Sequence, residues 1–204
     1  MNTQSPHSLE DGIHQYGFHI IDNFLGKSDY QDILTAIATK YQAGHFRQAR
    51  IGNNEKTQHK RAIRNDQICW LDSCSEYRGL KAYIAAIEII RNLLNQTFFL
   101  SLVDFEAHFA AYAPGSFYRK HIDQFLNTQD RKISCVYYLN SDWQPEHGGE
   151  LLIYNLQDEL LATIQPVGNR MICFSSDLPH EVLPTKAIRY SITGWLKTRS
   201  AIPF

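Results

Sequence analysis

The chain has 204 residues, a formal net charge of −1 and 44% hydrophobic residues. This size allows one domain with a substantial core, and the near-neutral charge excludes a general attraction to nucleic acid or membrane surfaces. No apolar run approaches the roughly 18 residues of a membrane helix. The four cysteines form no C-x-x-C pair and the N-terminus is polar, so we predict buried free thiols and a cytoplasmic protein.

The first half of the chain mixes strand and helix patterns. An aromatic and β-branched run at residues 16–25 predicts an opening strand. Ser28 and Gln31 have the spacing of a capping box, which is expected to start a helix that Gly44 ends. A broad apolar stripe at helical spacing predicts a second helix over residues 77–95.

A basic segment lies between the two predicted helices. From Arg47 to Arg64 there are six basic residues and one acidic residue, and the polar stretch 52–61 predicts a loop or a hairpin tip. A solvated loop and a loop that grips a partner are equally good interpretations of this pattern.

From residue 102 onward the hydrophobic period changes to two, which predicts β-strands. Turn residues separate the strand-like runs, of which the later ones cover residues 133–140, 150–154, 160–164, 170–174 and 188–196. Seven or eight short strands preceded by two helices predict an α+β fold with a sandwich or jelly-roll core. We therefore expect a tail (1–15) and one domain (16–204), with helical support and a loop in 16–100 and the β-core in 101–198.

The tripeptide His121-Ile122-Asp123 is a candidate metal motif. In a strand, residues two apart share a face and lie roughly 6.6 Å apart at the backbone, so both side chains can converge on one ion, with His180 as a third ligand. Two histidines and one carboxylate leave open coordination positions and suit Fe(II). The motif is weak alone, since an exposed strand histidine beside a turn aspartate would look the same.

Nine residues after His180, alternation places Arg189 on one strand face with Ser191, Thr193 and Trp195. An arginine inside an apolar core requires an anion, and its planar fork matches a carboxylate. The alternative is that Arg189 faces solvent while the opposite face is buried. Tyr138 could donate to the same carboxylate or be a core tyrosine.

Several runs carry the motifs and spacing of one known family: Tyr112–Gly115, Tyr118–Asp123, Cys135–Asn140, Asp142–Trp143, Gly148–Leu151, Pro179–Val182 and Arg189–Trp195. They resemble the 2-oxoglutarate/Fe(II)-dependent dioxygenases, and within these the prolyl hydroxylases of the hypoxia-sensing type and their bacterial relatives. Upstream, Ile63–Leu71 resembles the R-x-D-x-I-x-W run that precedes the long helix in that subgroup. The resemblance spans most of the chain and is weakest in the first 45 residues.

The resemblance implies a double-stranded β-helix (jelly-roll) core of mostly antiparallel strands, braced by N-terminal helices. It implies Fe(II) as the metal, 2-oxoglutarate and O2 as cosubstrates, and ascorbate as a reductant. The iron ligands implied are His121, Asp123 and His180. The implied residues around 2-oxoglutarate are Arg189, Tyr138 and Thr193 at its distal carboxylate, Tyr112 at its proximal end, and Val136, Leu151 and Trp195 along the pocket wall.

Four further positions follow from the same resemblance. His108 lies four residues before Tyr112, so a regular strand would place it beside the site, where relatives more often carry an apolar residue. We expect it to line the site rather than to be a fourth ligand. Asp66 and Arg131 match positions where the subgroup places a salt bridge that ties the substrate loop, including Arg64, to the core. The alternative is two surface charges of little energetic value.

The leading hypothesis is a prolyl 4-hydroxylase that acts on a proline in a cytosolic protein, which contacts the basic loop 47–64, and converts 2-oxoglutarate to succinate. One alternative keeps the chemistry but takes a free amino acid, a small molecule or another protein side chain. A third hypothesis is a non-catalytic jelly-roll module that binds RNA or protein.

Overall fold

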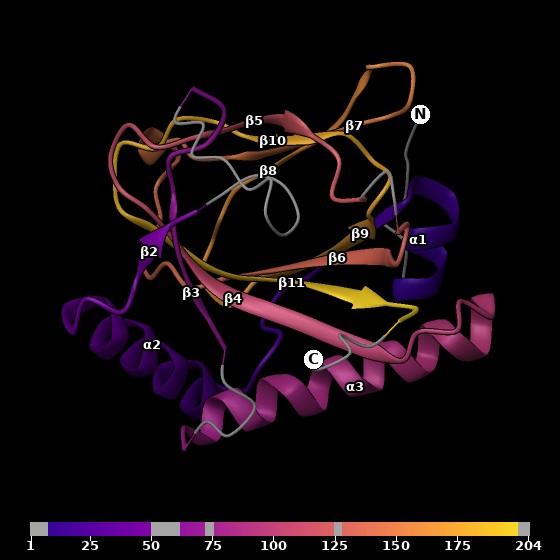
Figure 1. Ribbon diagram of the computed structural model, residues 1–204, viewed down its shortest axis with the longest axis horizontal. Helices are drawn as coiled ribbons and strands as arrows, with labels where there is room; N and C mark the ends of the chain where they lie inside the picture. The colour runs from indigo at the N-terminus through magenta and orange to yellow at the C-terminus, as the bar shows by residue number, and fades with distance from the viewer. Residues whose placement is uncertain (1–7, 50–61, 72–75, 125–127, 200–204) are drawn as a thin grey trace.

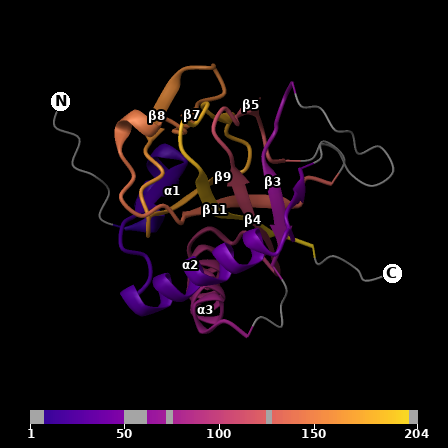
Figure 2. The same cartoon turned by 90° about the vertical axis from the view of Figure 1, so that its left-hand side faces the viewer.

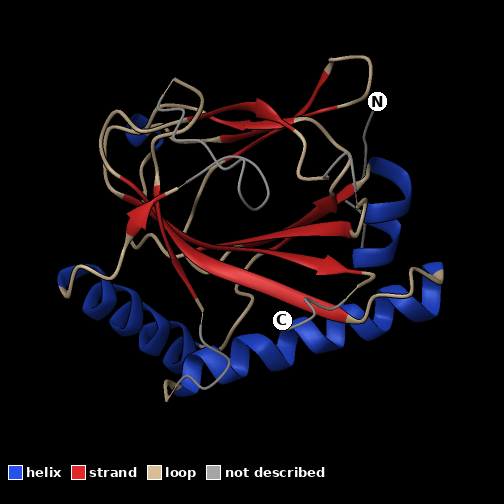
Figure 3. Cartoon of the chain, in the orientation of Figure 1, coloured by secondary structure: helices blue, strands red, loops and turns tan. Residues whose placement is uncertain are grey.

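Two stacked β-sheets form the protein, with two long helices against one sheet and a short helix at the edge (Figure 1; Figure 3). The computed structural model describes residues 8–49, 62–71, 76–124 and 128–199. The sequence-predicted loop 52–61, with most of the basic segment around it, lies outside these residues.

The larger sheet has seven strands in the order β1-β9-β6-β11-β4-β3-β2, and the smaller has four in the order β5-β10-β7-β8. Each pairing between neighbouring strands is antiparallel. The larger sheet comprises β1 (Phe18–Ile21), β2 (Arg47–Gln48), β3 (Gln67–Trp70), β4 (Asp104–Tyr112), β6 (Arg131–Tyr138), β9 (Met171–Ser175) and β11 (Arg189–Lys197). The smaller sheet comprises β5 (Tyr118–His121), β7 (Leu151–Tyr154), β8 (Leu160–Ile164) and β10 (His180–Val182).

Helices α2 (Lys27–Gln42) and α3 (Arg78–Phe98) cover the outer face of the larger sheet (Figure 2). Their close approach depends on Gly79, because a Cβ there would collide with the backbone carbonyl of Asp29. The short helix α1 (Leu9–Tyr16) contacts β1 and β9, and a 3₁₀ turn, η2 (Pro145–His147), precedes β7.

The side chains of the larger sheet divide between two apolar layers. On one face Phe109, Tyr137 and Ile192 pack toward the helices. On the other face Tyr138 belongs to a second cluster, which includes residues of the smaller sheet. Burying each of these large side chains contributes roughly 1.5–3 kcal/mol, so both faces of the sheet are fixed. The predicted alternation along β11 is therefore confirmed, with Arg189 and Ile192 both buried.

Two expectations for the N-terminal region are wrong. Residues 9–15 of the predicted tail 1–15 belong to α1, which continues to Tyr16 and whose eight residues are too few for a clear helical period, while residues 1–7 lie outside the described residues. The Ser8 hydroxyl caps α1, and Gly17 ends it at φ 77°. The capping box at Ser28 does not form, because α2 starts at Lys27 with Gly26 as its N-cap. The Ser28 hydroxyl instead accepts a hydrogen bond from Arg78.

The other predicted elements are confirmed with shifted ends. The opening strand shortens to β1, the second helix extends to Phe98, and each β-rich run of the second half contains a strand. Four strands were missed, namely β2, β3, β5 and β10. They have only two to four residues, which is too short for a period of two to show.

Candidate active site

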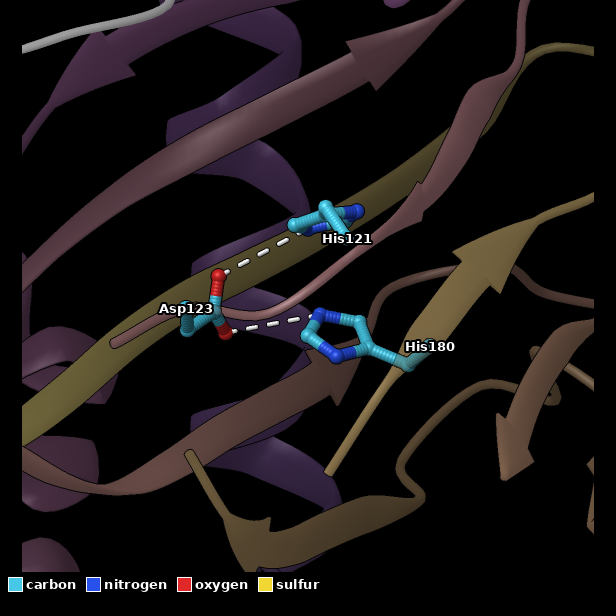
Figure 4. A group of neighbouring side chains, drawn as sticks. All are labelled: His121, Asp123 and His180. Carbon is cyan, nitrogen blue, oxygen red and sulfur yellow. Dashed lines mark ion pairs between the residues drawn. The ribbon is translucent and has the colours of Figure 1, made fainter. Parts of the chain in front are cut away.

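Three potential metal ligands converge between β5 and β10. His121, the last residue of β5, lies opposite His180, the first residue of β10, and one ligand atom from each of these and from Asp123 lies within 4.8 Å of the others. The Asp123 carboxylate is 3.6 Å from Nε2 of His121 and 3.5 Å from Nε2 of His180 (Figure 4). The expectation that one strand carries both His121 and Asp123 is wrong, because β5 ends at His121. Asp123 is instead held by its N–H, which donates to the Ser176 carbonyl.

Backbone carbonyls orient both imidazoles. Nδ1 of His121 lies 2.8 Å from the Arg119 carbonyl oxygen, and Nδ1 of His180 lies 2.9 Å from that of Leu178. A carbonyl only accepts, so Nδ1 carries the hydrogen in each ring and Nε2 keeps its lone pair. Both free lone pairs therefore lie on the side of Asp123, as metal ligands require.

The charge states of the group also suit a cation. Burial alone would raise the pKa of Asp123, but His180 and His121 hold it well below its usual range. Burial and the neighbouring His121 lower the pKa of His180 to about 4, although Asp123 acts in the opposite direction. Near neutral pH the group therefore offers an ionised carboxylate and a neutral His180 imidazole.

Ser134, on β6 of the larger sheet, holds the Asp123 carboxylate in place. Its hydroxyl donates to Oδ2 of Asp123 at 2.7 Å and lies 2.9 Å from the hydroxyl of Ser176. Ser134 is fully buried, so this contact fixes Oδ2, the carboxylate oxygen nearer His180, while Oδ1 is the oxygen nearer His121.

We expect Ser134→Ala to weaken Mn(II) binding about 10-fold, because groups that hold a ligand in place typically contribute 10- to 100-fold to metal affinity. Titration of the metal, followed by electron paramagnetic resonance, measures this change. Ser191→Ala is the matched control, since Ser191 is a buried serine of β11 and its hydroxyl contacts Thr193. Equal affinities in the two variants would contradict the support role of Ser134.

A buried cation lies farther along the same face. Arg189 is only 1% exposed, and its Nε donates to the Gly149 carbonyl at 2.9 Å. Its guanidinium lies 4.9 Å from the ring centroid of Tyr112 and 5.1 Å from that of Tyr138. Among the described residues no carboxylate forms an ion pair with Arg189. A buried, uncompensated guanidinium is costly, so this site fits an external anion.

The hydroxyl of Tyr138 adds a second unsatisfied group beside this cation. It is buried and has no hydrogen-bond partner in the described part of the chain. Burial raises the pKa of Tyr138, and Arg189 offsets part of this rise, so the phenol keeps its proton. An O–H donor beside a guanidinium is suited to a carboxylate.

The remaining sequence-predicted site residues lie on the same face of the sheet or across from it. In the register of β4, β11 and β6, Thr193 lies opposite both His108 and Val136. Trp195 is two residues farther along β11, and its ring is 5.6 Å from that of His108. Leu151 is buried on β7 of the smaller sheet.

His108 is a buried, neutral residue beside this row. Burial and the nearby Arg64 lower its pKa to about 4, and its Nδ1 lies 3.1 Å from the Phe109 carbonyl oxygen. Its ring also contacts Trp70 on β3 edge to face. Among the described residues, the group of converging metal ligands comprises His121, Asp123 and His180, and the role of His108 in lining the site stays a prediction.

The salt bridge expected between Asp66 and Arg131 is replaced by two others. Asp66, which is fully buried, pairs with Arg64, whose Nε donates at 2.7 Å. Arg131 pairs with Glu106 at 2.7 Å, because these residues flank the end of β11 on β6 and β4. The Arg131 guanidinium also lies over the Trp195 ring at 3.6 Å. Sequence reasoning missed Glu106 and the Tyr118 ring, which stacks on His121.

Comparison with known proteins gives this geometry a family. The model of the 2OG-Fe(II) oxygenase superfamily matches residues 107–197, which contain all three converging ligands and Arg189. Human prolyl hydroxylase EGLN3 is 31% identical over 192 residues, covering 90% of this chain and 79% of the relative. The chain belongs to the 2-oxoglutarate/Fe(II) oxygenases.

Solved structures confirm the predicted double-stranded β-helix core of this oxygenase. A prolyl-4-hydroxylase of Pseudomonas putida is 34% identical, with a TM-score of 0.84 over 94% of this chain and 97% of the other. A Trichoplax adhaerens prolyl hydroxylase, solved with a peptide fragment of the hypoxia inducible factor oxygen degradation domain, is 28% identical with a TM-score of 0.83. That match covers 93% of this chain and 87% of the other.

The cofactors of this oxygenase fit the donors present. Two imidazoles and one carboxylate form the facial set that Fe(II) oxygenases use, and the buried Arg189 and Tyr138 hydroxyl suit a dicarboxylate such as 2-oxoglutarate. The oxygenase therefore uses Fe(II), with 2-oxoglutarate and O2 as cosubstrates. None of its described helices has the length and hydropathy needed to cross a membrane.

Proposed function

We propose that the chain is a prolyl 4-hydroxylase that acts on a proline in a protein substrate. The main support is the 34% identity to the Pseudomonas putida prolyl-4-hydroxylase across nearly the whole of both chains. The relatives named for prolyl hydroxylation extend to the human enzyme, and the metal-ligand cluster with the buried arginine supplies the chemistry on this chain.

In this proposal His121, Asp123 and His180 would hold Fe(II). Bound Fe(II), with 2-oxoglutarate and O2, supplies the oxidation, which yields the hydroxylated carbon, succinate and CO2. The chain holds Asp123 ionised and directs both Nε2 atoms toward the metal. Ser134 and the two backbone carbonyls hold these three side chains in place through hydrogen bonds.

Arg189 would bind and orient 2-oxoglutarate. The Gly149 carbonyl occupies its Nε, which leaves the Nη groups for the distal carboxylate of the cosubstrate. Tyr138 and Thr193 would donate to the same carboxylate, and Tyr112 would approach the proximal end. The apolar residues Val136, Leu151 and Trp195, with His108 beside them, would exclude water from the site. Water exclusion matters because it prevents side reactions of the oxidant, including oxidation of the protein itself.

The proposal extends to the partner, the compartment and the reductant. Arg64, Asp66 and Arg131 are assigned to the substrate side, and the protein substrate would contact the basic loop 47–64. A cytoplasmic location is part of the proposal, with Cys135 and Cys173 as thiols buried in the apolar core. Ascorbate as a reductant is supported by the use of iron and is expected to raise the number of turnovers.

The substrate class is tested by mass spectrometry. Purified protein with Fe(II) and 2-oxoglutarate is incubated with a set of proline-containing peptides, with free amino acids and with denatured cellular protein. We expect a shift of about +16 Da on proline and one succinate formed per hydroxylation, as the family chemistry requires.

Each other outcome identifies a different function. A +16 shift confined to free amino acids or to non-proline side chains would overturn the proline assignment and keep the oxygenase chemistry. The non-catalytic hypothesis predicts salt-sensitive RNA binding that persists in His121→Ala, with no succinate formed from 2-oxoglutarate.

A further inference from the structure

The segment from residue 62 to β3 connects the two sheets at one end of the sandwich. Its first part runs along β5, where the N–H of Arg119 donates to the Ile63 carbonyl at 2.9 Å and Arg64 forms a bridge with Tyr118. Its last part is β3, which pairs with β4 of the larger sheet. We call residues 62–70 the crossing segment.

A continuous set of contacts leads from the crossing segment to a metal ligand. Asp66 is fully buried and holds Arg64 through both carboxylate oxygens. The Arg64 guanidinium lies over the Tyr118 ring at 4.2 Å from its centroid. The Tyr118 ring in turn stacks on the His121 imidazole, with the centroids 3.5 Å apart and the planes 14° from parallel.

An irregularity in β5 makes this stack possible. Tyr118 and His121 are three residues apart and would point to opposite faces of a regular strand. In the pairing with β10, however, the two-residue step from His180 to Val182 spans three residues of β5. This extra residue is a β-bulge, a feature that redirects side chains and is often found next to active sites.

We propose that Tyr118 and Arg64 are positioning residues for His121, so that metal affinity and the placement of the crossing segment are thermodynamically linked. The inference rests on the proposed metal site. The Arg119 carbonyl sets the hydrogen on Nδ1 of His121, but one hydrogen bond leaves the ring free to tilt. The Tyr118 ring restricts that tilt, and the Arg64–Asp66 pair restricts Tyr118.

Metal titration of the full chain tests the first part of the proposal. We expect Tyr118→Leu to weaken Mn(II) binding about 10-fold, as loss of a ligand's support does. Tyr118→Phe, which keeps the ring, should remain within about 2-fold of the parent. The double variant Arg64→Met/Asp66→Leu removes both buried charges together and should lose about 2- to 5-fold, the equivalent of a cation–π contact.

Lys120→Met is the matched control. Lys120, a residue of β5, resembles Arg64 in being a cation that lies over an aromatic ring. Its Nζ lies 3.4 Å from the Tyr154 centroid, and it pairs with Asp158. It neighbours His121 in sequence but its contacts lead away from the stack. Its substitution should leave Mn(II) affinity within about 2-fold.

Hydrogen exchange tests the linkage, because coupling between two sites is reciprocal. In the parent and in Tyr118→Phe, Mn(II) should slow hydrogen exchange in peptides that cover residues 62–70. In Tyr118→Leu, saturating Mn(II) should leave the exchange of these peptides unchanged. A merely destabilised fold would not lose this metal response selectively. Thermal unfolding without metal identifies any variant that is not folded.

The outcomes separate the two proposals. If the parent binds Mn(II) and Tyr118→Leu binds it equally well, the positioning role is overturned while the metal site stands. An unchanged exchange rate in the crossing segment on metal binding would overturn the linkage. If the parent binds no metal and Asp123→Ala behaves identically, the proposed function fails and this inference fails with it.

Discussion

Asp123→Ala is expected to abolish succinate formation. The loss of activity should exceed the ~100-fold that follows from removing a residue that only hydrogen-bonds to a metal ligand. Asp123 is the carboxylate of the converging group and lies within 3.6 Å of Nε2 of both histidines. Without it, only two imidazoles remain, and they offer no negative charge to a divalent cation. Succinate release in the presence of Fe(II) and 2-oxoglutarate measures the loss.

The same variant should stay folded. In the absence of metal it loses the Ser134 hydrogen bond, which contributes about 0.5–1.5 kcal/mol, and it removes a buried charge. Glu146→Ala is the control, because Glu146 is an exposed acid of the turn before β7. Succinate formation by Asp123→Ala at the rate of this control would refute the assignment of Asp123 as a ligand.

The β-core could be predicted from sequence because period two is strong where strands are long. β4 and β11 each have nine residues, and their alternating faces assign Arg189 to the inside and Ile192 to the helix side. The first 45 residues are less predictable. Helix α1 has one apolar residue per turn. The start of α2 is set by the Gly26 carbonyl, which accepts hydrogen bonds from the N–H groups of Asp29 and Tyr30.

The metal ligands of the candidate site could be predicted, because few residue types other than histidine and aspartate bind Fe(II). The two histidines and Asp123 were found by spacing, although Asp123 lies after β5. Pairings were harder to predict. Asp66 takes Arg64 rather than Arg131, since Arg64 is two residues away in an extended segment. The Tyr118 stack depends on a β-bulge, and spacing alone assigns Tyr118 to the wrong face.

Arg189→Met is expected to raise the KM for 2-oxoglutarate about 150- to 4000-fold and to leave Mn(II) affinity within about 2-fold. Removing one partner of a buried ion pair costs about 3–5 kcal/mol, because the other charge is left uncompensated. In this variant the uncompensated charge is the distal carboxylate of the cosubstrate. Methionine keeps most of the side-chain volume, so the neighbouring Tyr138 should retain its packing.

Without cosubstrate, Arg189→Met should be as stable as the parent or more stable, since it removes a buried cation that no described carboxylate pairs with. Succinate formation over a 2-oxoglutarate series and thermal unfolding of the metal-free protein measure the two effects. Arg78→Met is the control, because Arg78 is an exposed arginine of α3 that pairs with Asp29. A variant that lost stability and kept its KM would show that Arg189 serves the fold and that the anion binds elsewhere. The combination expected here, a weaker KM in a protein no less stable, is what a residue maintained for its ligand produces.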